Sequence, residues 1–272
     1  MKPPGTLVEV GGRSLHVMVE GSGPPVVLVG GLAGNWFDWD GVAALLTRAC
    51  TVVRFDRPGF GLSPASDEPP TVRGEADRIG AVLDAVGVRG PVTVVGHSMG
   101  GWYAEGFART NPGRASALVL LDTSIAARHP LALPRRWRLG VSTVLARGAS
   151  ACGLQRLAGP WVRLVTHGAP DAEAVEWIRL TFTDPDYLRS TLIENAAYPD
   201  LGAELERLRP LGPLPATLVV AADSGRSRRW VRAQRRLADR LGAGFESLRP
   251  ARHNMMADRP ASVAALIASM TV

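Results

Sequence analysis

The chain has 272 residues, 46% of them hydrophobic, which is enough to bury the core of one large α/β domain. Its net charge is +6, but Lys2 is the only lysine, and the arginines alternate with apolar residues as solvated helix faces do. This pattern argues against a nucleic-acid-binding footprint. No apolar leader follows Met1 and no stretch approaches the roughly 18 apolar residues of a membrane span, so we expect a cytoplasmic protein without membrane partners.

The first predicted element is an antiparallel hairpin. Residues 7–10 and 15–19 alternate in polarity around Gly11-Gly12, a pair suited to a two-residue turn. Short β-branched runs follow, separated by helix-length segments, as in βαβ units with buried parallel strands. These runs are residues 26–29, 52–55, 92–95, 118–121 and 218–220, and residues 245–248 are a last candidate strand.

Helices are predicted between these strands at about residues 39–48, 72–86, 98–109, 230–241 and 261–270. This alternation predicts a doubly wound, mostly parallel eight-stranded sheet with helices on both faces.

One interval breaks the alternation, because no convincing strand lies between Asp122 and Pro215. It combines apolar helical spacing with prolines that we interpret as helix breakers, at positions 160, 170, 185 and 199. We interpret this interval as an inserted helical cap. The predicted organisation is therefore a first core segment (1–124), a cap (125–210) and a second core segment (211–272).

A serine stands where a predicted strand turns sharply into a helix. Gly96-His97-Ser98-Met99-Gly100 follows the apolar run at 91–95 and fits the pattern GxSxG. Glycines at both ends let the turn pack strand against helix, while the serine takes a strained conformation with its Oγ exposed above the sheet. The segment predicts a nucleophile elbow at Ser98.

Three further segments occur in a fixed order around this elbow. Residues 27–32 follow the third strand, residues 55–63 contain a DxxGxGxS pattern, and Arg252-His253-Asn254 follows the last strand. Together they resemble the α/β-hydrolase superfamily, specifically its capped, esterase-like serine hydrolase branch. The resemblance implies an α/β-hydrolase fold, a catalytic triad and no requirement for a metal or an organic cofactor.

A serine hydroxyl is a weak nucleophile at neutral pH and needs a general base, which in turn needs a third group to orient it. The resemblance assigns the base to His253, in the loop after the last strand. The other four histidines are expected to be structural; they are His16, His97, His129 and His167.

Two residues compete for the acid of the triad. Most relatives carry it after the strand that corresponds to residues 216–221, but there this chain places Gly225 in the acid's usual slot and Asp223 beside it. A subset of the superfamily carries the acid one strand earlier, where this chain has Asp122. We favour Asp122 and keep Asp223 as the alternative, because a triad is defined by geometry and not by sequence position.

The oxyanion hole is expected to consist of two backbone N–H groups, those of Leu32 and Met99. This chain departs from the family here, since Gly30-Gly31 stands where relatives usually have His-Gly. That histidine orients the loop, so we expect the oxyanion hole to survive with an altered loop conformation.

These residues predict hydrolysis of an ester-like small molecule, namely a carboxylic ester, lactone, thioester or amide, through an acyl-enzyme. A serine at the elbow argues against the dehalogenases and epoxide hydrolases of the superfamily, which use a carboxylate nucleophile. Three catalytic alternatives stay open: carbon–carbon bond hydrolysis, a lyase reaction and perhydrolysis. A non-catalytic protein that binds a small ligand is the alternative from another class, favoured by Gly30 and Gly225.

Overall fold

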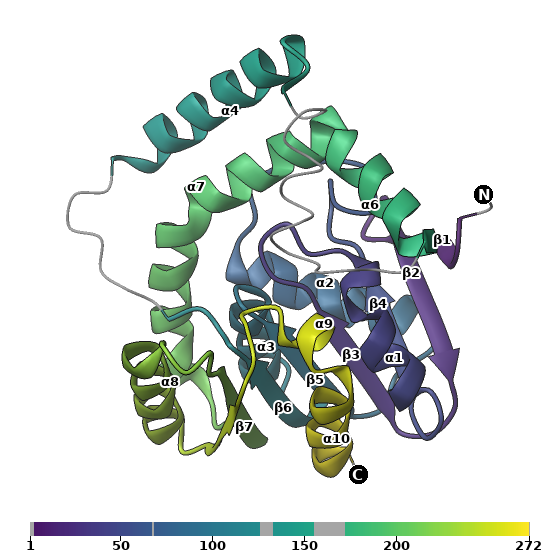
Figure 1. Ribbon diagram of the computed structural model, residues 1–272, viewed down its shortest axis with the longest axis vertical. Coiled ribbons are helices and arrows are strands. Elements are labelled where there is room, and N and C mark those ends of the chain that lie inside the picture. The colour runs from purple at the N-terminus through teal and green to yellow at the C-terminus, as the bar shows by residue number, and fades with distance from the viewer. Residues whose placement is uncertain (1–2, 67, 126–132, 155–171, 272) are drawn as a thin grey trace.

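The computed structural model describes residues 3–66, 68–125, 133–154 and 172–271. Within these residues eight strands form a single sheet in the order β1-β2-β4-β3-β5-β6-β7-β8 (Figure 1). The sheet is antiparallel from β1 through β2 to β4 and parallel beyond. The strands are β1 (Thr6–Val10), β2 (Arg13–Gly21), β3 (Pro25–Val29), β4 (Thr51–Phe55), β5 (Val92–His97), β6 (Ala115–Leu121), β7 (Ala216–Ala222) and β8 (Gly244–Leu248). The predicted doubly wound, mostly parallel sheet is confirmed.

The opening hairpin has the predicted two-residue turn. Val10 pairs with Arg13, and both intervening glycines have positive φ values, 59° at Gly11 and 78° at Gly12. A turn of this kind requires the left-handed backbone region at both positions, which glycine adopts without steric cost. The pair therefore sets the register of β1 against β2.

Helices cover both faces of the sheet because neighbouring strand residues point to opposite sides. Val27 and Val29 pack in the core beneath α2, α3 and α8, whereas Val26 and Leu28 pack against α1, α9 and α10. The bounds are α1 (Asp40–Leu46), α2 (Val72–Ala85), α3 (Gly100–Thr110), α8 (Arg228–Leu241), α9 (Met255–Asp258) and α10 (Pro260–Met270). The five predicted helices are confirmed, whereas α9 and the short 3₁₀ helices η1 (Trp36–Trp39) and η2 (Arg209–Leu211) were not predicted.

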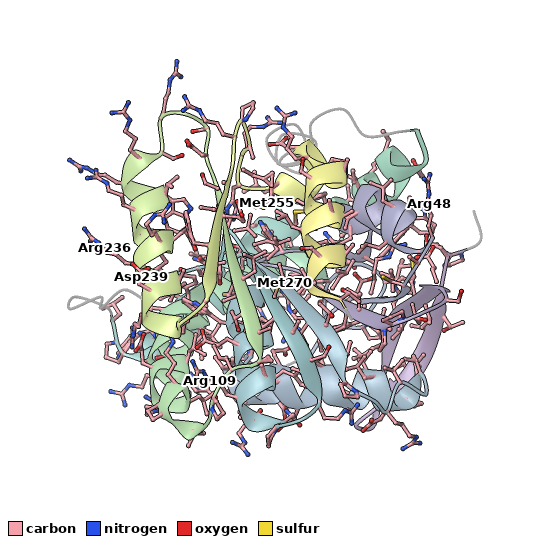
Figure 2. All side chains as sticks on the ribbon, turned by 90° about the horizontal axis from the view of Figure 1, so that it is seen from below. Arg48, Arg109, Arg236, Asp239, Met255 and Met270 are labelled. Carbon is pink, nitrogen blue, oxygen red and sulfur yellow. The ribbon has the colours of Figure 1, made fainter. Side chains whose placement is uncertain are left out.

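The arginine-rich helix α8 presents its charged side chains to solvent. Arg236 and Asp239 are exposed and project away from the sheet, whereas Met255 of α9 is buried (Figure 2). This agrees with the interpretation of the arginine run as a solvated helix face.

Three helices are described between β6 and β7: α4 (Arg135–Ala151), α6 (Ala172–Thr183) and α7 (Pro185–Leu208). The helix α4 lies outside α7, farther from the sheet (Figure 1). Residues 126–132 and 155–171, and with them His129 and His167, lie outside the described residues. None of the described helices combines the length and apolar character needed to cross a bilayer.

Two prolines in this interval behave differently from one another. Pro185 begins α7, where a missing N–H costs nothing, and the Asp184 carboxylate caps the helix by accepting from the Asp186 N–H at 2.9 Å. Pro199, interpreted above as a breaker, instead lies inside α7, so that interpretation was wrong. The helix continues through it because Ala197 and Leu201 on either side are buried in the main core.

Candidate functional site

Ser98 lies in the tight turn between β5 and α3, with a φ of 52°. A methyl group on Gly96 would lie 2.5 Å from the Gly100 carbonyl oxygen, and one on Gly100 would lie 2.3 Å from that of Gly30. Such contacts are impossible, so glycine is required at both ends of the motif. A non-glycine residue at positive φ stores strain, and such strain is concentrated at functional sites. The structure therefore has the strand–turn–helix geometry that the GxSxG pattern predicts.

A continuous chain of hydrogen bonds joins Ser98, His253 and Asp122. His253 Nε2 lies 3.0 Å from Ser98 Oγ, and His253 Nδ1 lies 2.5 Å from Asp122 Oδ2. In the neutral imidazole, Nδ1 donates to the carboxylate, so Nε2 is free to accept the serine proton. The Asp122 side chain is 4% exposed and the imidazole 54%, so the acid is shielded from water while the base faces the pocket.

Asp122 is held by groups from distant parts of the chain. Its own φ is 41°, and its N–H donates to the Val220 carbonyl at 2.7 Å. The second carboxylate oxygen, Oδ1, accepts from the Ala222 N–H at 2.9 Å and from the Trp230 indole N–H at 2.6 Å. These donors fix the carboxylate in place. Sequence analysis did not single out Trp230, which lies 108 positions from Asp122 and carries no local signal.

Asp223 makes a different set of contacts. Its Oδ1 accepts from the Gly225 N–H at 2.7 Å, which closes a local turn, and its own N–H donates to the Leu248 carbonyl at 2.9 Å. Of the two candidate acids, Asp122 is the one that contacts His253 within the described part of the chain.

His97 supports the backbone of the loop that carries His253. Its Nε2 donates to the His253 carbonyl at 2.9 Å, and the two rings lie 4.7 Å apart. Burial, with a further contribution from the nearby imidazole of His253, lowers the pKa of His97 to about 4. His97 is therefore neutral near pH 7 and acts as a hydrogen-bond donor.

His16 and Asp56 form a separate buried pair. Nδ1 of His16 lies 2.8 Å from Asp56 Oδ2, and the same carboxylate accepts from the Trp36 and Leu62 N–H groups at 2.8 and 3.0 Å. These contacts tie the loop after β4 to the hairpin and to η1, which is a structural role.

The loop after β3 passes beside Ser98. The Gly31 carbonyl accepts from the Gly34 N–H at 2.9 Å, and Ala33 within this turn has a φ of 57°. A methyl group on Gly31 would lie only 2.9 Å from Ser98 Cβ, so this chain path requires glycine there. Leu32 therefore lies beside the serine, and Met99, the second predicted contributor, follows the serine directly and is fully buried.

A cavity of about 270 Å³ opens on Ser98 and His253. Its wall includes Leu32 from the loop after β3, and Phe182 and Tyr187 from α6 and α7. A cavity of this volume can hold a small molecule. No group of three or more His, Cys, Asp or Glu side chains in the described ranges is placed to hold a metal ion.

The model of the alpha/beta hydrolase family matches residues 26–266. The chain belongs to this family. The match covers the elbow, the loop after β3 and the His253 loop. These segments follow the carboxyl ends of the parallel strands β5, β3 and β8. The alpha/beta hydrolase resemblance described above is thereby confirmed.

Among curated alpha/beta hydrolase relatives, a cis-3-alkyl-4-alkyloxetan-2-one decarboxylase from Shewanella oneidensis is 35% identical over 152 residues, which cover 52% of this chain and 46% of the relative. Lipase LipV from Mycobacterium tuberculosis is 39% identical over 114 residues, covering 41% of this chain and 42% of the lipase. The chain thus spans less than half the length of these relatives. The crystal structure of Cfl2 from Burkholderia cenocepacia superposes with a TM-score of 0.80 at 25% identity, covering 98% of this chain and 95% of Cfl2.

Proposed function

We propose that this protein is a serine hydrolase that cleaves ester-like small molecules through Ser98, His253 and Asp122. The observation that carries the proposal is the continuous hydrogen-bond chain from Ser98 Oγ through the His253 ring to a buried carboxylate. Each member has the partner that its role requires, since the nucleophile contacts the base and the base contacts a fixed acid.

In this mechanism, Ser98 Oγ attacks the substrate carbonyl while His253 Nε2 takes its proton. The N–H groups of Leu32 and Met99 stabilise the oxyanion, and His253 then protonates the leaving group. Water activated by the same imidazole cleaves the acyl-enzyme and regenerates Ser98. Asp122 holds the imidazole in the reactive tautomer and stabilises its positive charge, and no step requires a metal or an organic cofactor.

Several proteins similar to this chain are epoxide hydrolases, including one from Corynebacterium that is 32% identical over 115 residues. A serine at the elbow supports acyl transfer for this chain, because the epoxide hydrolases of the superfamily use a carboxylate nucleophile at that position. The segment between β6 and β7, which we propose is a cap, supplies Phe182 and Tyr187 to the pocket and would contribute to substrate choice.

Hydrolysis of short and medium p-nitrophenyl esters by wild type and Ser98→Ala tests the proposal. We expect turnover in the wild type and a loss of up to about 10⁶-fold in kcat for the variant. Absence of Ser98-dependent turnover, together with absence of labelling by a serine-directed phosphonate, would favour the non-catalytic binding protein.

A lyase reaction on a strained cyclic ester is a second candidate, favoured by the similarity to the oxetan-2-one decarboxylase. An oxetan-2-one is a four-membered lactone. Incubating the protein with such a lactone distinguishes the two activities, because hydrolysis yields a 3-hydroxy acid, whereas decarboxylation yields an alkene and carbon dioxide.

A further inference from the structure

A buried arginine holds the loop that we propose forms half of the oxyanion hole. Arg57, two residues beyond β4, donates from Nη1 to the Gly30 carbonyl at 2.5 Å and from Nη2 to the Gly31 carbonyl at 2.8 Å. Its side chain is 4% exposed. Relatives usually have His-Gly where this chain has Gly30-Gly31, so the guanidinium binds the backbone where the loop lacks its usual histidine.

The same guanidinium is paired with Glu194 of α7. Arg57 Nη2 lies 2.8 and 2.9 Å from the two carboxylate oxygens, and the Tyr103 hydroxyl donates to one of them at 2.9 Å. Burial alone would lower the pKa of Arg57, but the Glu194 carboxylate, together with the nearby Tyr103 and Glu75, raises it, so the pKa lies above its usual value. Because an unpaired charge at this depth is strongly unfavourable, the arginine is confined to this position.

The contact of Arg57 with Gly31, together with the Gly34 N–H that donates to the same carbonyl at 2.9 Å, fixes where the Leu32 N–H points. The Gly31 carbonyl and the Leu32 N–H belong to one planar trans peptide unit, so they point in opposite directions. A hydrogen bond that holds the Gly31 carbonyl in place therefore also fixes the direction of the Leu32 N–H. On the next residue of the loop, the Tyr187 hydroxyl of α7 donates to the Ala33 carbonyl at 2.8 Å.

We infer that Arg57 is a positioning residue: held by Glu194, it orients the Leu32 N–H of the oxyanion hole and takes the place of the family's loop histidine. The inference rests on the proposed function. It also makes α7 part of the catalytic machinery, because the carboxylate that fixes the guanidinium comes from that helix.

Steady-state hydrolysis of a p-nitrophenyl ester by Arg57→Lys and Glu194→Gln tests the inference, with active sites counted by phosphonate titration. A lysine ammonium keeps the charge but lacks the planar fork that reaches two carbonyls and a carboxylate together. We expect kcat to fall about 10²-fold in Arg57→Lys and about 10-fold in Glu194→Gln, with KM nearly unchanged, because the oxyanion forms only during reaction.

Arg109→Lys is the matched control. The Arg109 side chain is 7% exposed, pairs with Glu105 at 2.9 Å, and donates to the Arg209 and Gly212 carbonyls at 2.6 and 2.9 Å. It lies near the C-terminal end of α3, labelled in Figure 2 and about 15 Å along the helix from the Ser98 turn. This variant is expected to lose thermal stability as Arg57→Lys does, yet to keep the wild-type kcat per titrated site.

A wild-type kcat in Arg57→Lys, or a loss no larger than that of Arg109→Lys, would overturn the inference. If Arg57→Lys does not fold, Glu194→Gln decides the question, and an unchanged kcat there overturns it equally. If the wild type shows neither turnover nor phosphonate labelling, it is the proposed function that fails.

Discussion

The ends of β6 and β7 lie side by side in the sheet, and each is followed directly by an aspartate, Asp122 after β6 and Asp223 after β7. At the end of β6 the backbone turns to positive φ at Asp122, and the carboxylate points at His253. After β7 the Asp223 carboxylate bends back to its own Gly225 N–H. Two similar residues on neighbouring strands thus make different contacts because their backbones direct the side chains differently.

The largest expected effect comes from exchanging each acid for its amide. In Asp122→Asn the amide cannot hold the reactive tautomer or stabilise the imidazolium, so kcat/KM for an activated ester should fall about 10⁴-fold. Asp223→Asn should stay within about 2-fold of wild type, because its carboxylate serves a local turn. An equal loss of kcat/KM in Asp223→Asn and Asp122→Asn would contradict the assignment of Asp122 alone as the acid that orients His253.

His97, at the end of β5 on the other side of β6, should make the free energy of unfolding depend on pH. The pKa of His97 falls from 6.5 unfolded to about 4 folded, so between these values the unfolded chain binds more protons. The contribution of neutral, buried His97 to the free energy of unfolding should be fully present above pH 6.5. It should decrease by about 3 kcal/mol as the pH falls to 4. Urea unfolding at pH 7 and pH 4 measures this decrease, which should be much smaller in His97→Gln. An equal decrease in wild type and His97→Gln would show that His97 is not the source of this pH dependence.

Packing at the end of β6 offers a steric test. A methyl group on Gly101 would lie 2.1 Å from Thr123 Oγ1 and 2.8 Å from Thr123 Cβ, so Gly101→Ala should push the Asp122 segment out of place. The expected loss is about 1–3 kcal/mol in the free energy of unfolding, with a lower kcat. Gly148→Ala on α4, where nothing lies within 4 Å, is the control and should gain about 0.5–1 kcal/mol. If the two variants unfold alike, the predicted clash is absent.

The smallest effect concerns the indole that holds Asp122. Trp230→Phe removes the donor at 2.6 Å from Oδ1, and kcat/KM should fall about 10-fold because one hydrogen bond to a charged group is lost. In an Asp122→Asn background the same change should cost much less, since the two residues act together. Full additivity of the two losses would show that Trp230 acts elsewhere.

The two strand ends also show which features can be predicted from sequence and which cannot. Strands, helices and the Ser98 elbow were predictable because periodicity and GxSxG are local patterns, and the His253 loop follows the last strand in order. The choice between Asp122 and Asp223 was not decidable in this way. It depends on a positive φ and on donors about 100 residues away, Ala222 and Trp230.

The contact between Arg57 and Glu194 was beyond sequence analysis for the same reason, since 137 positions separate the partners. Its one sequence signal is the lack of the usual histidine at Gly30, which indicates that another group must hold the loop but does not indicate which one. Pro199 gave a misleading signal, because burial of its neighbours outweighs the helix-breaking tendency of proline.

The rate of phosphonate labelling at Ser98, followed by intact-protein mass spectrometry, tests the central claim most directly. Wild type and Asp223→Asn should gain one adduct at the same rate, with peptide mapping placing it on Ser98. Asp122→Asn should be labelled orders of magnitude more slowly, because the imidazole is no longer fixed as the base. Equal labelling of all three proteins, or an adduct at another residue, would contradict the assignment of Ser98, His253 and Asp122 as one catalytic unit.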